Sequence, residues 1–128
     1  MALKDLLKVM IVDDMSVSRG LMMQSLEEIG IKNIDFQTSG AEAVNRLGVN
    51  PAHLIISDYN MPGMSGLDLL ERVRMNKATS KVGFILITGS PSQELLDRGI
   101  KLGLNNLIKK PFTTASLIAS IEAVVGKL

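Results

Sequence analysis

The chain has 128 residues, enough for one domain that buries about two-thirds of the surface of its unfolded chain. Its net charge is +1, whereas nucleic-acid-binding proteins usually carry an excess of basic residues, so we expect no nucleic-acid partner. The absence of cysteine excludes disulfides and thiolate metal sites, and no apolar run approaches the ~20 residues of a membrane span. With no signal-peptide pattern at the N-terminus, residues 1–128 are predicted to form one cytoplasmic domain.

The first half of the chain alternates between strand and helix patterns. Lys8–Val12 and Asn33–Gln37 are short runs with the residue types of β-strands. Between them a helix is predicted from a candidate N-cap at Ser16 to a stop signal at Gly30. Its apolar residues at helical spacing are Val17, Leu21, Met22, Leu26 and Ile29. A shorter helix is predicted over Ala41–Leu47, ended by the glycine that follows.

The second half of the chain repeats the alternation three times. Leu54–Ser57, Val82–Ile87 and Asn106–Lys109 are predicted strands. The helix pattern after each of them opens at a polar residue that can cap a helix N-terminus. These openings are Ser65 with Asp68, Ser90 with Pro91 and Gln93, and Thr113 or Thr114.

Five strands alternating with five helices predict an α/β fold of the doubly wound (βα)5 type. Such alternation implies parallel strands joined by right-handed crossovers, with helices on both faces of the sheet. The apolar runs Leu54–Ser57 and Val82–Ile87 fit strands that are buried on both faces. In open sheets of this kind, ligands bind beyond the carboxyl ends of the strands.

Reactive side chains stand at the carboxyl ends of four predicted strands: Asp13 and Asp14, then Asp58, Thr88 and Lys110. An N-cap or a turn would account for one of the two adjacent aspartates, but not for both. Three carboxylates within about 4–6 Å repel one another, and a divalent cation would relieve the repulsion. Oxygen ligands favour Mg²⁺ over zinc. The lysine adds a positive charge and the threonine adds a hydroxyl donor. Together with the carboxylates and their cation, these side chains predict a binding site for a phosphoryl group.

The segments around these residues resemble the receiver domains of two-component response regulators, in particular the single-domain CheY-like proteins. The resemblance covers essentially the whole chain and is carried by Ile11–Asp14, Asp58–Gly66, Ile87–Gly89 and Lys110–Phe112. It implies a flavodoxin-like sheet with strand order 2-1-3-4-5. It also implies a phosphorylation-activated regulator of bacterial chemotaxis, which is no enzyme but assists its own phosphorylation and dephosphorylation.

The resemblance implies a metal site for Mg²⁺. Asp14 and Asp58 would bind the ion directly, and the backbone carbonyl of Asn60 would supply a third ligand. Asp13 would act mostly through bound water.

The resemblance also implies how the phosphoryl group is held. Asp58 would be the phosphoacceptor, and the Thr88 hydroxyl would hydrogen-bond the phosphoryl oxygens. Lys110 would pair with the same oxygens, because it directly precedes Pro111 in a bond expected to be cis, whereas Lys109 would be solvated.

The resemblance implies a monomeric protein with two kinds of partner. These are a CheA-like sensor histidine kinase and a flagellar motor switch protein or another output protein. No output domain is expected after Leu128, so we expect the signal to leave through the last strand and the last two helices. Small residues are expected on the outer face of the last helix: Ala119, Ser120 and Ala123. Three positions before the lysine, Leu107 replaces the aromatic residue with which many receivers switch.

Three alternatives remain open from the sequence. One is a phosphate sink or phosphorelay intermediate built on the same receiver. A flavodoxin-like carrier of FMN is less favoured, since Asp13 and Asp14 would repel its phosphate. An aspartyl-nucleophile phosphohydrolase would have an aspartate two positions after Asp58, where this chain has Asn60.

Overall fold

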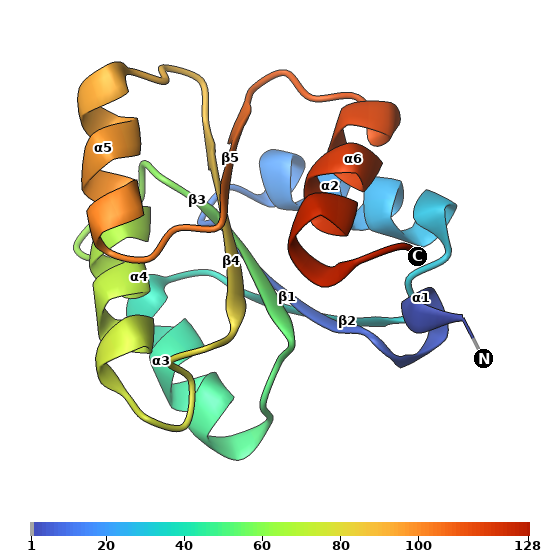
Figure 1. The fold of residues 1–128 in the computed structure, drawn as a ribbon, viewed down its shortest axis with the longest axis horizontal. Coiled ribbons are helices and arrows are strands. Elements are labelled where there is room, and N and C mark those ends of the chain that lie inside the picture. The colour runs from blue at the N-terminus through green and yellow to red at the C-terminus, as the bar shows by residue number, and fades with distance from the viewer. Residues whose placement is uncertain (1) are drawn as a thin grey trace.

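The structure is a computed structural model that describes residues 2–128, and it contains a five-stranded parallel sheet with helices on both faces (Figure 1). The strand order is β2-β1-β3-β4-β5, which confirms the predicted fold class and order. The strands are β1 (Lys8–Val12), β2 (Asn33–Gln37), β3 (Leu54–Asp58), β4 (Gly83–Thr88) and β5 (Asn106–Lys109). Compared with the prediction, β3 ends one residue later and β4 is shifted by one residue.

Helices α3, α4 and α5 cover one face of the sheet, and α2 and α6 cover the other (Figure 1). The helices are α1 (Leu3–Leu6), α2 (Ser16–Ile29), α3 (Gly40–Val49), α4 (Gly66–Met75), α5 (Gln93–Lys101) and α6 (Thr114–Val125). The short α1 was not predicted, because four residues are too few for a periodic pattern. Within residues 2–128 no helix has the length and apolar character needed to cross a membrane.

The core has two apolar clusters, one on each face of the sheet. Successive residues of β1 alternate between them, with Val9 and Ile11 on the side of α2 and α6 and Met10 and Val12 on the other side. All four side chains are buried. The central strands are therefore buried on both faces, as parallel strands between helix layers are expected to be.

The strand register brings the predicted site residues to one edge of the sheet. Asp58 lies opposite Ile87 of β4, and Thr88 lies opposite Lys109 of β5. The Tyr59 amide donates a hydrogen bond to the Ile87 carbonyl at 2.9 Å, so the pairing continues past the end of β3. The side chains that follow β1, β3, β4 and β5 thus start from neighbouring backbone positions.

Several predicted helix ends are confirmed. Ser65 and Asp68 form a reciprocal capping box at the start of α4. Gly30 ends α2 with φ of 100°, a left-handed conformation that favours glycine. Thr113 caps α6, which settles the choice between Thr113 and Thr114.

Other predicted helix ends were wrong. The α5 helix is capped by Ser92, whose Oγ accepts the Leu95 amide, and not by Ser90. Ser16 is the first residue of α2 and not its cap. The α3 helix continues past Gly48 to Val49, because one glycine weakens a helix without necessarily ending it.

The faces of α2 and α6 also differ from their sequence patterns. Met22 and Leu26 are buried, but Val17 and Leu21 are 73% and 56% exposed. On α6, Ala119 and Ala123 are exposed as expected, whereas Ser120 is only 8% exposed and its hydroxyl has no hydrogen-bond partner in the described chain. The list of small outward residues on α6 was therefore wrong at Ser120, since this residue faces the sheet. No sequence period distinguishes the covered from the uncovered apolar positions of α2.

Candidate phosphoryl and metal site

Three carboxylates meet at the carboxyl edge of the sheet. One oxygen each of Asp13, Asp14 and Asp58 lies within 4.8 Å of the other two. Asp13 and Asp58 are buried, while Asp14 is exposed. The structure confirms that the aspartates after β1 lie close to the aspartate at the end of β3. The three carboxylates of this cluster offer only oxygen atoms as ligands.

The turn after β1 is held in place by its own hydrogen bonds. The Met15 amide donates a hydrogen bond of 3.0 Å to the Asp13 carboxylate, and Nη1 of Arg19 donates one of 3.0 Å to the Asp13 carbonyl. The Arg19 guanidinium also lies over the ring of Phe36, 4.9 Å from its centre. These contacts join the first turn of α2 to the carboxylate cluster.

Lys110 places a positive charge next to Asp58. Its Nζ lies 2.8 Å from Oδ1 of Asp58, and its backbone amide donates to the Thr88 carbonyl at 2.8 Å. The Lys110–Pro111 bond is cis, as predicted. The Lys110 ammonium also donates to Oγ of Ser18 at 3.2 Å. A carboxylate from β3 and a lysine after β5 therefore form one ion pair at the sheet edge.

Burial raises the pKa of the Asp58 carboxyl above its usual value, and the neighbouring charges of Asp13 and Asp14 act in the same direction. The hydrogen bond and the charge of Lys110 lower the pKa but do not cancel the effect of burial. A raised pKa in the folded state means that protonated Asp58 favours folding. This contribution is full below the usual pKa of 3.8 and is lost as the pH rises through the higher pKa of the folded protein.

Thr88 and Asn60 complete the predicted set. Thr88 is the last residue of β4 and is buried, and its Oγ1 accepts the Ser90 amide at 3.1 Å. Asn60 is exposed in the loop between β3 and α4, two residues after Asp58. Thr88 therefore starts from the strand next to Asp58, and its hydroxyl is bonded to the loop that leads into α5.

The arrangement can bind an anion next to a nucleophilic carboxylate once a cation balances the three aspartates. Residues 9–122 match the family described as the response regulator receiver domain.

The chain belongs to this family.

Relatives of this receiver carry chemotaxis names. It is 41% identical over 128 residues to a protein of Rhizobium etli named "Probable chemotaxis protein CheY", covering all of this chain and 99% of the relative. It is 34% identical over 121 residues to chemotaxis protein CheY1 of Helicobacter pylori, covering 94% of this chain and 98% of the relative. The solved structure of Vibrio cholerae CheY4 superposes with a TM-score of 0.87 at 28% identity, covering 92% and 98% of the two chains. This receiver is a phosphorylation-activated response regulator of the chemotaxis type.

Two residues at the site were not predicted from the sequence. Ser18 and Arg19 lie in the first turns of α2, where one contacts Lys110 and the other contacts the Asp13 carbonyl. The only signal in the sequence is their closeness to Asp14, four and five positions along a predicted helix. That spacing does not indicate which side of the helix faces Lys110.

Proposed function

We propose that this receiver accepts a phosphoryl group on Asp58 from a sensor histidine kinase of the chemotaxis type. The observation that carries the proposal is the position of the Asp58 carboxylate, which joins the cluster with Asp13 and Asp14 and lies 2.8 Å from Lys110. In its phosphorylated state the receiver binds an output protein, for which we propose a component of the flagellar motor switch.

The proposed reaction is an in-line transfer to a carboxylate. An oxygen of Asp58 attacks phosphorus, and a bond forms between them as the bond from phosphorus to the donor imidazole breaks. The electron pair of the broken bond stays on the imidazole nitrogen. Lys110 offsets the negative charge of the phosphoryl oxygens, and Thr88 donates its hydroxyl to one of them. The receiver thus assists both its own phosphorylation and the later hydrolysis of the acyl phosphate.

The residues of the cluster fit Mg²⁺, which prefers oxygen ligands. We propose that Asp14, Asp58 and the backbone carbonyl of Asn60 hold the ion, with Asp13 acting through water. When bound, the ion would neutralise the carboxylates and polarise the phosphoryl oxygens. Burial is the main reason that the pKa of Asp58 is raised, and the charges of Asp13 and Asp14 add to it, so a bound cation would favour the ionised carboxylate.

Mg²⁺ should raise the melting temperature of the wild-type protein and should do so much less for Asp14→Ala. The reason is that a ligand bound only by the folded state stabilises it, and this variant removes one proposed ligand. At 100 times the dissociation constant the wild type should gain about 2.7 kcal/mol. Thermal unfolding with and without Mg²⁺ measures the difference.

Glu71→Gln is the matched control, because Glu71 is an exposed carboxylate on α4 outside the cluster. It should keep the full Mg²⁺ shift. An equal shift in Asp14→Ala and wild type would remove Asp14 from the proposed ligand set.

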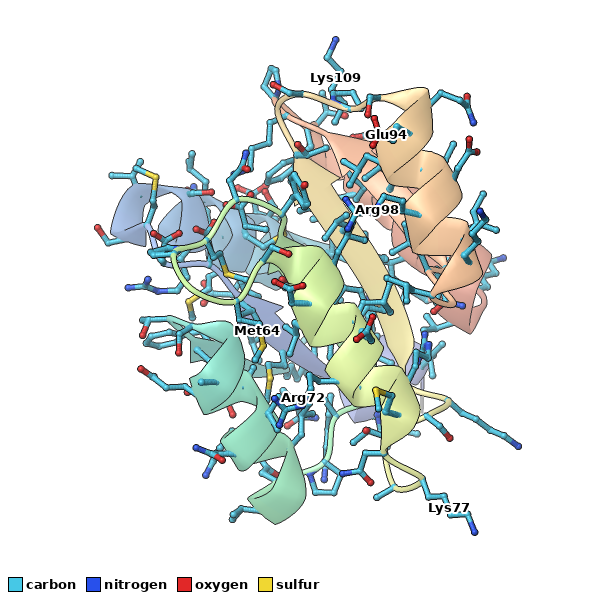
Figure 2. All side chains as sticks on the ribbon, turned by 90° about the vertical axis from the view of Figure 1, so that its left-hand side faces the viewer. Met64, Arg72, Lys77, Glu94, Arg98 and Lys109 are labelled. Carbon is cyan, nitrogen blue, oxygen red and sulfur yellow. The ribbon has the colours of Figure 1, made fainter. Side chains whose placement is uncertain are left out.

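Lys110→Ala should lose the phosphorylated state or its signal, whereas Lys109→Ala should keep it. Of these two lysines, Lys110 forms the ion pair with Asp58, while the Lys109 side chain extends away from the protein at the end of β5 (Figure 2). We expect the Lys110 variant to bind beryllofluoride at least about tenfold more weakly, since it removes a charge-assisted contact. Calorimetric titration of beryllofluoride in Mg²⁺ compares the two variants. If only the Lys109 change weakened binding, the choice of lysine would be wrong.

The groove between β5 and α6 supports an output surface on this side of the receiver. It has a volume of about 540 Å³, and Leu107, Lys109, Ala119 and the buried Ser120 contribute to its lining. Small residues on α6 permit close approach of a partner. A pull-down with and without beryllofluoride against the kinase and the motor switch component tests the output. Capture of the kinase alone, with no beryllofluoride-dependent capture of the switch, would favour a phosphate sink instead.

A further inference from the structure

We propose that Ser18 is a positioning residue that holds the Lys110 ammonium over Asp58. This inference rests on the function proposed above. Ser18 lies near the start of α2, and its Oγ is 3.2 Å from Nζ of Lys110, 92 positions away in the sequence. The same Nζ lies 2.8 Å from Oδ1 of Asp58. The ammonium is thus held between a helix on one face of the sheet and the carboxylate at its edge.

A lysine needs such a contact to act as a fixed charge. Its ammonium is carried on a flexible four-carbon stem and has three hydrogen-bond donors. The Lys110 side chain is 32% exposed, so water competes for the ammonium. With two donors directed to Asp58 and Ser18, the third donor is available to a phosphoryl oxygen.

The contact with Ser18 also persists when Asp58 changes. Phosphorylation turns a charged Asp58 oxygen into the bridging oxygen of an acyl phosphate, which weakens its attraction for Lys110. The Ser18 hydroxyl undergoes no such change, so it can hold Lys110 both before and after the transfer. The proposed role is therefore to keep the cation in reach while its partner moves from Asp58 to the phosphoryl group.

Ser18 is itself held firmly relative to the site. The turn before α2 is bonded through Met15 and the helix through Arg19, and both contacts are with Asp13. Between Ser18, Asp58 and Lys110 there is a cavity of only about 10 Å³, room for no more than about one water. A serine in a helix commonly bonds to a carbonyl of the preceding turn or to water. Here its hydroxyl accepts from a charged group across the site.

The test compares Ser18→Ala with Ser25→Ala and Ser18→Thr. Ser25 is a matched control, because it lies two turns later on α2 and, with Lys110, lines a second groove between α2 and the segment 110–112, without bonding to Lys110. Two measurements are made: the hydrogen exchange of the Lys110 ammonium by ¹⁵N NMR, and the affinity for beryllofluoride in saturating Mg²⁺. The first reports the bond in the resting protein, and the second reports its use in the phosphorylated state.

Ser18→Ala should speed the exchange of the Lys110 ammonium and weaken beryllofluoride binding by about threefold to tenfold. Ser25→Ala should match wild type in both measurements, and Ser18→Thr should restore most of the loss because it keeps the hydroxyl. Unchanged exchange in Ser18→Ala would show that the bond is absent and would overturn the proposal. Faster exchange with unchanged affinity would equally overturn it, since the bond would then have no positioning role. Failure of the wild type to bind beryllofluoride would instead count against the function proposed for Asp58.

Discussion

Asp58→Asn should abolish the Mg²⁺-dependent incorporation of a phosphoryl group from a small phosphodonor. The amide is close to the carboxylate in size and shape but lacks the anionic oxygen that attacks phosphorus. Asp13 and Asp14 remain in this variant. Within residues 2–128, however, neither of their carboxylates forms an ion pair with Lys110. Stoichiometric labelling of the wild type should therefore fall to background in the variant. Intact-mass spectrometry after treatment with acetyl phosphate measures the gain of one phosphoryl group.

Asp97→Asn provides the matched control for this experiment. Asp97 is an exposed aspartate on α5, and in the described part of the chain its carboxylate accepts a hydrogen bond from the Gln93 side chain alone. This variant should label like wild type. Unchanged labelling of Asp58→Asn would overturn the assignment of the phosphoacceptor. Labelling that moves to Asp13 or Asp14 would show that the cluster activates any of its carboxylates.

Thr88→Ala should uncouple phosphorylation from partner binding. The Thr88 hydroxyl accepts the Ser90 amide at 3.1 Å, so it bonds directly to the loop before α5. If Thr88 moves toward a phosphoryl oxygen, that hydrogen bond must break or the loop must follow. Gly89 gives the loop backbone freedom, and Ser92 caps the helix that follows. Such a movement would be passed to α5 through the loop 89–92, because α5 begins at Gln93 after its cap at Ser92.

Leu107→Ala should keep a phosphorylation-dependent change in partner affinity. Leu107 is partly buried against the apolar cluster under α3, α4 and α5, opposite Leu86 of β4. Leucine has no hydroxyl group that could move between a buried and an exposed position. The rotamer of Leu107 should therefore contribute little to the switch. Its truncation should instead lower the free energy of unfolding by about 1–3 kcal/mol, less than for a fully buried leucine.

Partner affinity with and without beryllofluoride distinguishes these two variants. The increase in partner affinity caused by beryllofluoride should be at least about tenfold smaller in Thr88→Ala than in wild type, in line with the loss of one hydrogen bond to a charged group. Thr88→Ser keeps the hydroxyl and is the matched control, which should retain most of the gain. If Leu107→Ala removed the gain while Thr88→Ala preserved it, the signal would pass through β5 and the proposed coupling would be wrong.

The sequence by itself determined the class of fold and which three carboxylates meet at the edge of the sheet. Alternating strand and helix patterns allow few arrangements other than a parallel sheet with helices on both faces, so the elements could be predicted from local periodicity. Because the carboxyl ends of parallel strands share one edge, Asp13, Asp14 and Asp58 were predicted to meet, and they do. The capping box of Ser65 with Asp68 depends on neighbours within one turn and was equally readable.

Only the tertiary structure decided which contacts form between distant segments. The apolar pattern of α2 predicted buried residues, but packing leaves Val17 and Leu21 exposed beside the site. Whether a serine such as Ser120 faces the sheet depends on how its helix is rotated against the strands. The contact of Ser18 with Lys110 likewise depends on where α2 packs relative to the end of β5. Local propensity acts over a few residues, whereas these positions are set by sheet register and helix packing across the whole chain.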